Sequence, residues 1–132
     1  FEEVKNDNFG LEWEPTHQMV QLIDPVAELR KWCKKDRPCT WKRCDHRLGC
    51  SKTRRNLRSS SFCMAPYAGF GDTNWRDIIS ILRSNGYEDD ICIEGYHDPV
   101  YRGELEMTGQ LHALNYLKWC RGGEFTPTPW EK

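Results

Sequence analysis

Short apolar runs alternate with helical periodicities at the two ends of the chain. Residues 91–93 form an apolar run between polar turns, and its length and its isoleucines predict a strand that is buried on both faces. A second run at 9–14 predicts an earlier strand. Each run ends on a carboxylate, which is Glu94 in the later strand and Glu14 in the earlier one.

Three other stretches have helical spacing. Asp24 and Pro25 predict a helix start, because Asp is a favoured N-cap and Pro fits the first helical position. A second helix is predicted from Thr73 or Asn74 onward, and a third from about 105 to 120. The residues expected to face the core are Trp75, Ile78, Ile79 and Leu82 in the second helix, and Met107, Leu111, Leu114 and Leu117 in the third.

Alternating strands and helices indicate an α/β fold with parallel strands, but the middle of the chain does not fit this pattern. Residues 30–58 hold 12 of the 19 Lys and Arg, and five of the seven cysteines lie within 33–63. Large apolar side chains are too few there to offset the entropy cost of ordering the chain. We therefore expect residues 33 to about 66 to lack a regular strand and to pack poorly. Residues 124–132 are expected to form a tail.

Charge and hydropathy narrow the range of partners. A net charge of −1 favours neither a nucleic acid nor a membrane surface. No apolar run approaches the roughly 20 residues that a membrane-spanning helix needs, and no signal peptide is visible. We therefore expect a cytoplasmic protein that binds neither nucleic acid nor membranes.

Glu14 and Glu94 are the first candidate functional residues. The carboxyl ends of parallel strands meet at one edge of a sheet, and in α/β barrels that edge carries the chemistry. Both glutamates are therefore candidate metal ligands or acid–base groups, with solvated strand-end residues as the alternative. Their separation leaves room for a further strand near 36–41, although the sequence there is not that of a buried strand.

Two histidines lie close to these glutamates. His17, in a loop predicted at 15–17, could contact a substrate above the first strand end, or be an ordinary surface histidine. His97 and Asp98 could orient Glu94 through hydrogen bonds, or they could form a turn. The adjoining Pro99 favours the turn.

Four cysteines and a histidine in the middle segment have partial metal-ligand character. The close C-x2-C pair that makes zinc signatures specific is missing, so structural zinc is a minor alternative. A disulfide framework would need an oxidising compartment, for which the sequence offers no targeting signal. The residues concerned are Cys33, Cys39, Cys44, His46 and Cys50.

The flanking stretches resemble the sugar phosphate isomerase/epimerase family, the xylose isomerase-like TIM barrels. The resemblance rests on residues 10–17 with 23–25, on 69–72 with Trp75, and on 86–101. With the last helix it covers roughly 90 residues. It implies that residues 1–132 are the C-terminal part of a (β/α)8 TIM barrel, about strands 6 to 8, interrupted by an irregular middle segment.

The resemblance also implies a divalent metal ion (Mn, Mg, Co or Zn), which the family holds with Glu, Asp, His and Glu from the fifth to the eighth strands. Glu94 matches the last metal ligand and would be the catalytic acid–base group. Glu14 matches the second metal ligand, with a side chain one methylene longer than the family's Asp. His17 matches the family's substrate-binding histidine. The first Glu of the set would precede Phe1.

The third ligand should come from a seventh-strand motif resembling His-Val-His-Gly-Lys-Asp, which is absent. The codons allowed for residues 38–46 permit this motif when read one base later, and those from Cys33 permit Val-Lys-Lys-Ile-Val before it. Residues 63–69 likewise permit a shifted sequence that runs into Phe70. We therefore hypothesise that residues 33 to about 68 are translated out of frame. A genuine basic, cysteine-rich insertion is the alternative.

The function implied by the resemblance is metal-dependent isomerisation or epimerisation of a sugar or sugar phosphate through an enediolate, with carboxylates moving the proton. Because two ligands of the family set are missing, we expect the chain as written to have little or no activity, although its parent fold is an enzyme. One alternative is an inosose dehydratase-like lyase of the same superfamily. Another, from a different class, is a non-enzymatic Cys-rich zinc-binding or interaction module.

Overall fold

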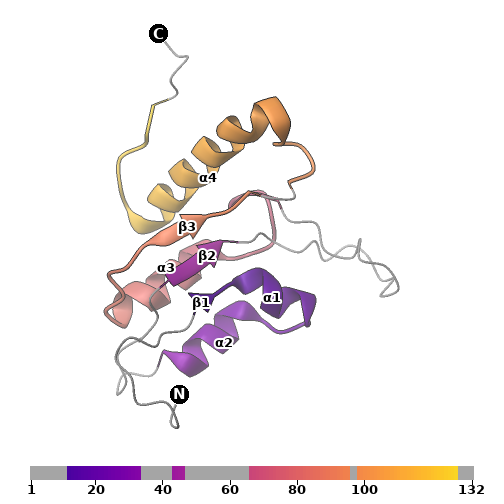
Figure 1. Cartoon of the computed structure of the whole chain (residues 1–132). Coiled ribbons are helices and arrows are strands. Elements are labelled where there is room, and N and C mark those ends of the chain that lie inside the picture. The colour runs from indigo at the N-terminus through magenta and orange to yellow at the C-terminus, as the bar shows by residue number, and fades with distance from the viewer. Residues whose placement is uncertain (1–11, 34–42, 47–65, 96–97, 128–132) are drawn as a thin grey trace.

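A computed structural model describes four ranges of the chain, with the backbone alone described for the second. Within these ranges, three short strands form one sheet in the order β1-β2-β3 (Figure 1). Both strand pairs are parallel, as the alternation of strands and helices predicted, while closure into an eight-stranded barrel stays a prediction. The strands are β1 (Glu12–Trp13), β2 (Arg43–His46) and β3 (Ile91–Ile93). The described ranges are 12–33, 43–46, 66–95 and 98–127.

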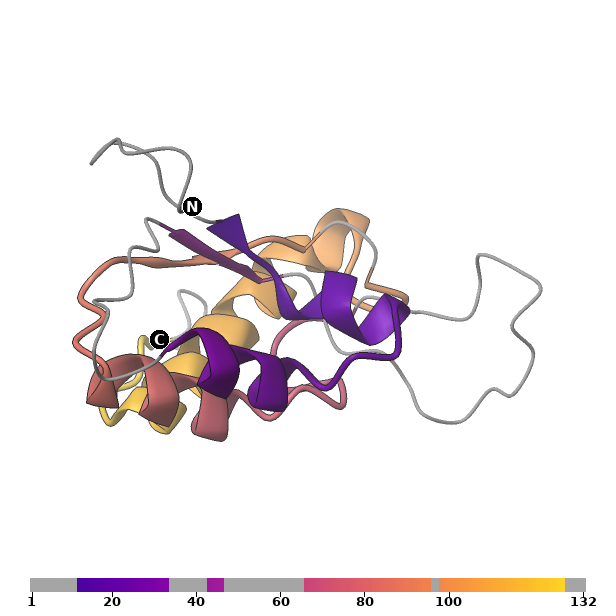
Figure 2. The same ribbon diagram turned by 90° about the horizontal axis from the view of Figure 1, so that it is seen from below.

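Four α-helices accompany the strands in the described part of the chain. Figure 2 shows α2, α3 and α4 on one side of the three strands. Among the helices of these ranges, none has both the length and the apolar composition to cross a bilayer. The helices are α1 (Pro15–Val20), α2 (Pro25–Trp32), α3 (Trp75–Ser84) and α4 (Glu106–Arg121), with a 3-10 turn at Gly103–Leu105 before α4.

The two helix starts predicted from capping residues are confirmed. Asp24 Oδ1 accepts hydrogen bonds from the backbone N–H groups of Val26 (2.9 Å) and Ala27 (3.1 Å) at the start of α2. Asn74 Oδ1 accepts one from the N–H of Asp77 at 3.1 Å and caps α3. Each cap satisfies donors that have no partner inside the helix, and such caps contribute about 1 kcal/mol.

The core lies between the strands and α3. All four residues predicted to face the core from α3 are buried, and they form one cluster with Trp13 of β1 and Leu29 of α2. The predicted apolar face of α3 is therefore confirmed.

β2 corrects the expectation that residues 33 to about 66 contain no regular strand. Arg43–His46 pair with β1 on one side and with β3 on the other. Main-chain N–H and C=O groups form such a ladder whatever the side chains are, so a basic segment can fill the gap between two strand edges. The interval 36–41, where the spacing suggested a strand, lies outside the described residues.

Residues 66–68, at the end of the same segment, are better packed than the sequence predicted. Tyr67 and Ala68 are buried, at 0% and 4% exposure. The Tyr67 ring lies so close to Gly95 and Gly109 that a Cβ added at either glycine would stand 1.9 Å or 2.4 Å from ring atoms. Two glycines on other elements therefore make room for one large side chain.

The burial predicted for β3 is wrong, whereas the burial predicted for α4 is confirmed at Leu117 and wrong at Met107. Residues 91–93 are half-buried and not buried on both faces, because β3 is the last strand of the described sheet. In α4 the buried residues are Gly109, Ala113 and Leu117, whereas Met107 is 72% exposed. Tyr67 fills the space above Gly109, so the small side of the helix faces inward.

Candidate functional site

Glu14 and Glu94 directly follow β1 and β3, so parallel pairing brings both to the carboxyl edge of the sheet. The register aligns Trp13 with Cys44 and Cys44 with Ile91, which places Glu94 two residues further along the strand direction than Glu14. At ~3.3 Å per residue and ~4.8 Å between strands, their backbone positions lie roughly 12 Å apart. The shared edge is confirmed, and convergence of the two carboxylates on one pocket stays a prediction.

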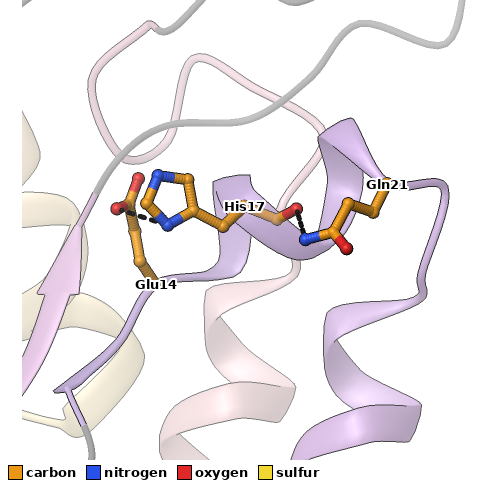
Figure 3. Close-up of polar contacts among 3 residues, drawn as sticks. All are labelled: Glu14, His17 and Gln21. Carbon is orange, nitrogen blue, oxygen red and sulfur yellow. Dashed lines mark hydrogen bonds and ion pairs between the residues drawn. The ribbon is translucent and has the colours of Figure 1, made fainter.

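α1 forms the first half of the site and corrects the loop predicted at 15–17. Glu14 is extended (φ −134°, ψ 113°), the conformation that a following proline favours, and Pro15 then opens the helix. His17 is three residues after Glu14, a spacing at which side chains meet on one helical turn. Figure 3 shows the imidazole facing the carboxylate, with His17 Nδ1 3.3 Å from Glu14 Oε2.

The two partners differ sharply in exposure. The side chain of Glu14 is 9% exposed and its Oε1 atom is buried, whereas the side chain of His17 is 64% exposed. Gln21, the residue after α1, donates a hydrogen bond from Nε2 to the carbonyl oxygen of His17 at 3.1 Å. This bond links the end of the helix to the residue that forms the site. A buried carboxylate is therefore paired with an exposed imidazole.

The second half of the site surrounds Glu94, which is half-buried just beyond β3. Tyr67 packs on the next residue, Gly95, and its hydroxyl donates to the carbonyl oxygen of Gly95 at 3.4 Å. Burial, followed by the negative charges of Glu106 and Asp98, raises the pKa of Tyr67. The phenol therefore stays protonated and remains a hydrogen-bond donor beside Glu94.

Asp98 is a turn residue, as its sequence context favoured. It is 3% exposed, and its carboxylate accepts hydrogen bonds from three backbone N–H groups, those of Tyr67 (2.8 Å), Val100 (2.8 Å) and Tyr101 (2.6 Å). These bonds attach the loop after β3 to the segment before α3. His97 lies outside the described residues.

The described residues do not fit the complete metal site that the family resemblance implies. Across ranges 12–33, 66–95 and 98–127, no group of three or more His, Cys, Asp or Glu side chains is placed to hold a metal ion. Glu14, His17 and Glu94 therefore do not form a full ligand set. Apart from Cys33, the side chains of the candidate zinc ligands lie outside the described residues.

A hollow of about 670 Å³ is lined by residues of α3, β3 and α4, among them Leu82, Ile91 and Leu117, and by residues 87–90, which precede β3. Neither Glu14 nor Glu94 is among its lining residues.

Two of these contacts are not predicted by the sequence pattern. The pairing of Glu14 with His17 was missed because Pro15 fits a loop as well as a helix start; the i,i+3 spacing of a carboxylate and an imidazole could have suggested it. Tyr67 was missed because its partners, Gly95 and Gly109, have no side chains that a hydrophobic pattern could register.

No family model and no curated protein matches the chain. The resemblance to sugar phosphate isomerases therefore stays a prediction from the sequence.

Proposed function

We propose that the chain descends from a metal-dependent isomerase or epimerase of sugars or sugar phosphates, and that in its present form it catalyses little or no turnover. The observation that carries this proposal is the position of Glu14 and Glu94 after two parallel strands, at one edge of the sheet. α/β barrels concentrate their chemistry at that edge. Because one fold hosts many reactions, the reaction class comes from the family resemblance.

In the proposed parent, Glu94 removes a proton from the carbon next to the sugar carbonyl and returns it. His17 binds a hydroxyl of the same substrate. A divalent metal ion would polarise the carbonyl in the parent. A catalytic metal site needs about three protein ligands and an open position, and the described residues offer no such set. The seventh-strand motif that would supply a third ligand is absent from the sequence, so we expect little or no turnover from this chain.

The out-of-frame origin of residues 33 to about 68 is part of the proposal, because it accounts for the missing seventh-strand histidine. Independent sequencing of the encoding DNA around codons 32 and 69 is the direct check. An undisturbed frame in every read would contradict this part of the proposal.

A ketose epimerisation assay with Mn²⁺ or Mg²⁺ tests the function. It compares this chain with a repaired barrel that restores the shifted frame and supplies the preceding strands. We expect turnover from the repaired barrel alone, and we expect Glu94→Gln to abolish it there. Comparable turnover by the 132-residue chain would contradict the inactivity. No turnover by the repaired barrel on any ketose tried would contradict the assignment of the parent.

A cytoplasmic location and a small-molecule sugar or sugar phosphate as partner belong to the same proposal.

A further inference from the structure

We infer that Glu14 is a positioning residue for His17 and not a metal ligand in this chain, and that His17 Nε2 is the atom that meets a substrate hydroxyl. The kind of ligand rests on the proposed function. The roles of the two residues rest on their geometry alone. The inference reverses what the resemblance implies, where the carboxylate would hold the metal ion.

The Glu14 carboxylate is mostly buried, and one of its oxygens faces His17. Oε2 lies 3.3 Å from His17 Nδ1, Oε1 is buried, and the residue as a whole is 8% exposed. A catalytic metal ion keeps one coordination position open to water or substrate, so its ligands must border an accessible space. Glu14 could bind such an ion only by leaving His17 and turning outward.

The backbone holds Glu14 and His17 in this arrangement. Pro15 fixes the backbone angle at the start of α1, and the N–H of His17 donates to the carbonyl oxygen of Glu14 at 3.2 Å. On the other side of Glu14, Trp13 is buried and its Nε1–H donates to Glu28 Oε2 at 3.3 Å. The carboxylate and the imidazole therefore share one turn whose ends are both anchored.

A carboxylate that faces Nδ1 favours the imidazole tautomer with its proton on that nitrogen. Neutral His17 then carries its lone pair on Nε2, whereas Nδ1 is the nitrogen that the dashed line in Figure 3 joins to Glu14. Nε2 accepts a hydrogen bond in this tautomer and cannot donate one. A sugar hydroxyl is a suitable partner, whereas a carbonyl oxygen is not, because a carbonyl oxygen needs a donor.

Nitrogen NMR on the full ¹⁵N-labelled chain tests the positioning role, since ring correlations distinguish Nδ1–H from Nε2–H. The spectra are recorded at a pH where the imidazole is neutral, and His17→Gln identifies the signals. We expect the Nδ1–H tautomer in the unchanged chain. Glu14→Gln should retain it because the amide oxygen still accepts a hydrogen bond, and Glu14→Leu should lose it. The matched control is Glu124→Gln, which removes one exposed negative charge outside this turn and should leave the tautomer unchanged.

A Mn²⁺ titration separates positioning from ligation. Mn²⁺ should broaden the His17 ring signals of the unchanged chain and of Glu14→Gln equally, either in neither chain or in both with apparent affinities that agree within about twofold. A loss of about tenfold or more in Glu14→Gln, equivalent to about 1.4 kcal/mol, would overturn the inference. A predominant Nε2–H tautomer in the unchanged chain would overturn it as well. Neither readout needs turnover, so a failure here is distinguishable from a failure of the proposed function.

Discussion

α3 and α4 pack against each other beside the sheet, yet they bury different kinds of residue. α3 buries its large side chains, with Trp75 among the largest in the core. α4 buries Leu117 together with two small residues, Gly109 and Ala113, and exposes Met107 and Trp119. The side chains of α3 fill the space between α3 and its neighbours. Beside α4, part of that space is filled by the ring of Tyr67, which belongs to a loop and packs against Gly109. The buried face of a helix is thus set by the space its neighbours leave as much as by its own hydrophobicity.

The largest expected loss of stability comes from replacing the buried tryptophan of α3, and a tryptophan of α4 provides the comparison. Trp75→Ala in α3 should lower the free energy of unfolding by about 3–5 kcal/mol, because it empties a fully buried site. Urea unfolding followed by circular dichroism measures the change.

Trp119→Ala in α4 is the matched variant. Trp119 is 58% exposed and stacks on Tyr116 at a centroid distance of 6.1 Å, so the expected loss is about 0.5–1.5 kcal/mol. If Trp75→Ala and Trp119→Ala lowered the free energy of unfolding equally, the two helices would not differ in the way described.

A methyl group added to the small face of α4 should also destabilise the fold. Alanine is the better helix former by about 1 kcal/mol, yet the Cβ of Gly109→Ala would meet the Tyr67 ring at 2.4 Å. We expect a net loss of about 1–3 kcal/mol from overpacking. Gly123→Ala, whose nearest neighbour lies at 3.7 Å, is the control and should change stability by less than about 0.5 kcal/mol. Stabilisation by Gly109→Ala would show that Tyr67 does not occupy this space.

Tyr116 allows a pH test of the same face of α4. Burial, followed by Cys120, raises the pKa of Tyr116 from 10.0 to about 12. The phenol of the unfolded chain ionises first as the pH rises, so the contribution of Tyr116 is complete below pH 10 and is lost between about pH 10 and 12. Urea midpoints should fall across this window, and less steeply in Tyr116→Phe. An identical fall in both chains would place the tyrosine in solvent.

The smallest expected effect concerns the residue that hydrophobicity placed in the core. Met107→Ala should change the free energy of unfolding by less than about 0.5 kcal/mol, because its side chain is 72% exposed. Leu117→Ala on the buried side of α4 should cost about 2–5 kcal/mol in the same urea assay. A loss of about 2–5 kcal/mol for Met107→Ala would show that Met107 packs in the core, as the sequence pattern predicted.

The sequence predicted well where a residue's own chemistry decides its surroundings. Asp24 and Asn74 cap helices because their short side chains reach nearby N–H groups, and Trp75 is buried because its own helix carries the apolar stripe. The prediction failed where distant neighbours decide. Gly109 is buried because Tyr67 needs space, and a single-helix pattern contains nothing about that ring.

The candidate site divides in the same way. The positions of Glu14 and Glu94 at one sheet edge follow from parallel strands, which the alternating pattern predicts. The inward turn of the Glu14 carboxylate depends on α1, a helix of 6 residues that carries too few apolar positions to show a period. His17 was therefore identified as a candidate without its partner.

The buried carboxylate of Asp98 has a consequence for the order in which the molecule opens. It holds the amides of Tyr67, Val100 and Tyr101, which come from two segments about thirty residues apart in the chain. Local opening in proteins proceeds in cooperative units, and groups that depend on one acceptor belong to the same unit. The three amides should therefore exchange their hydrogens with solvent in a single event. The loop beside Glu94 and the segment leading into α3 would then unfold locally in the same event.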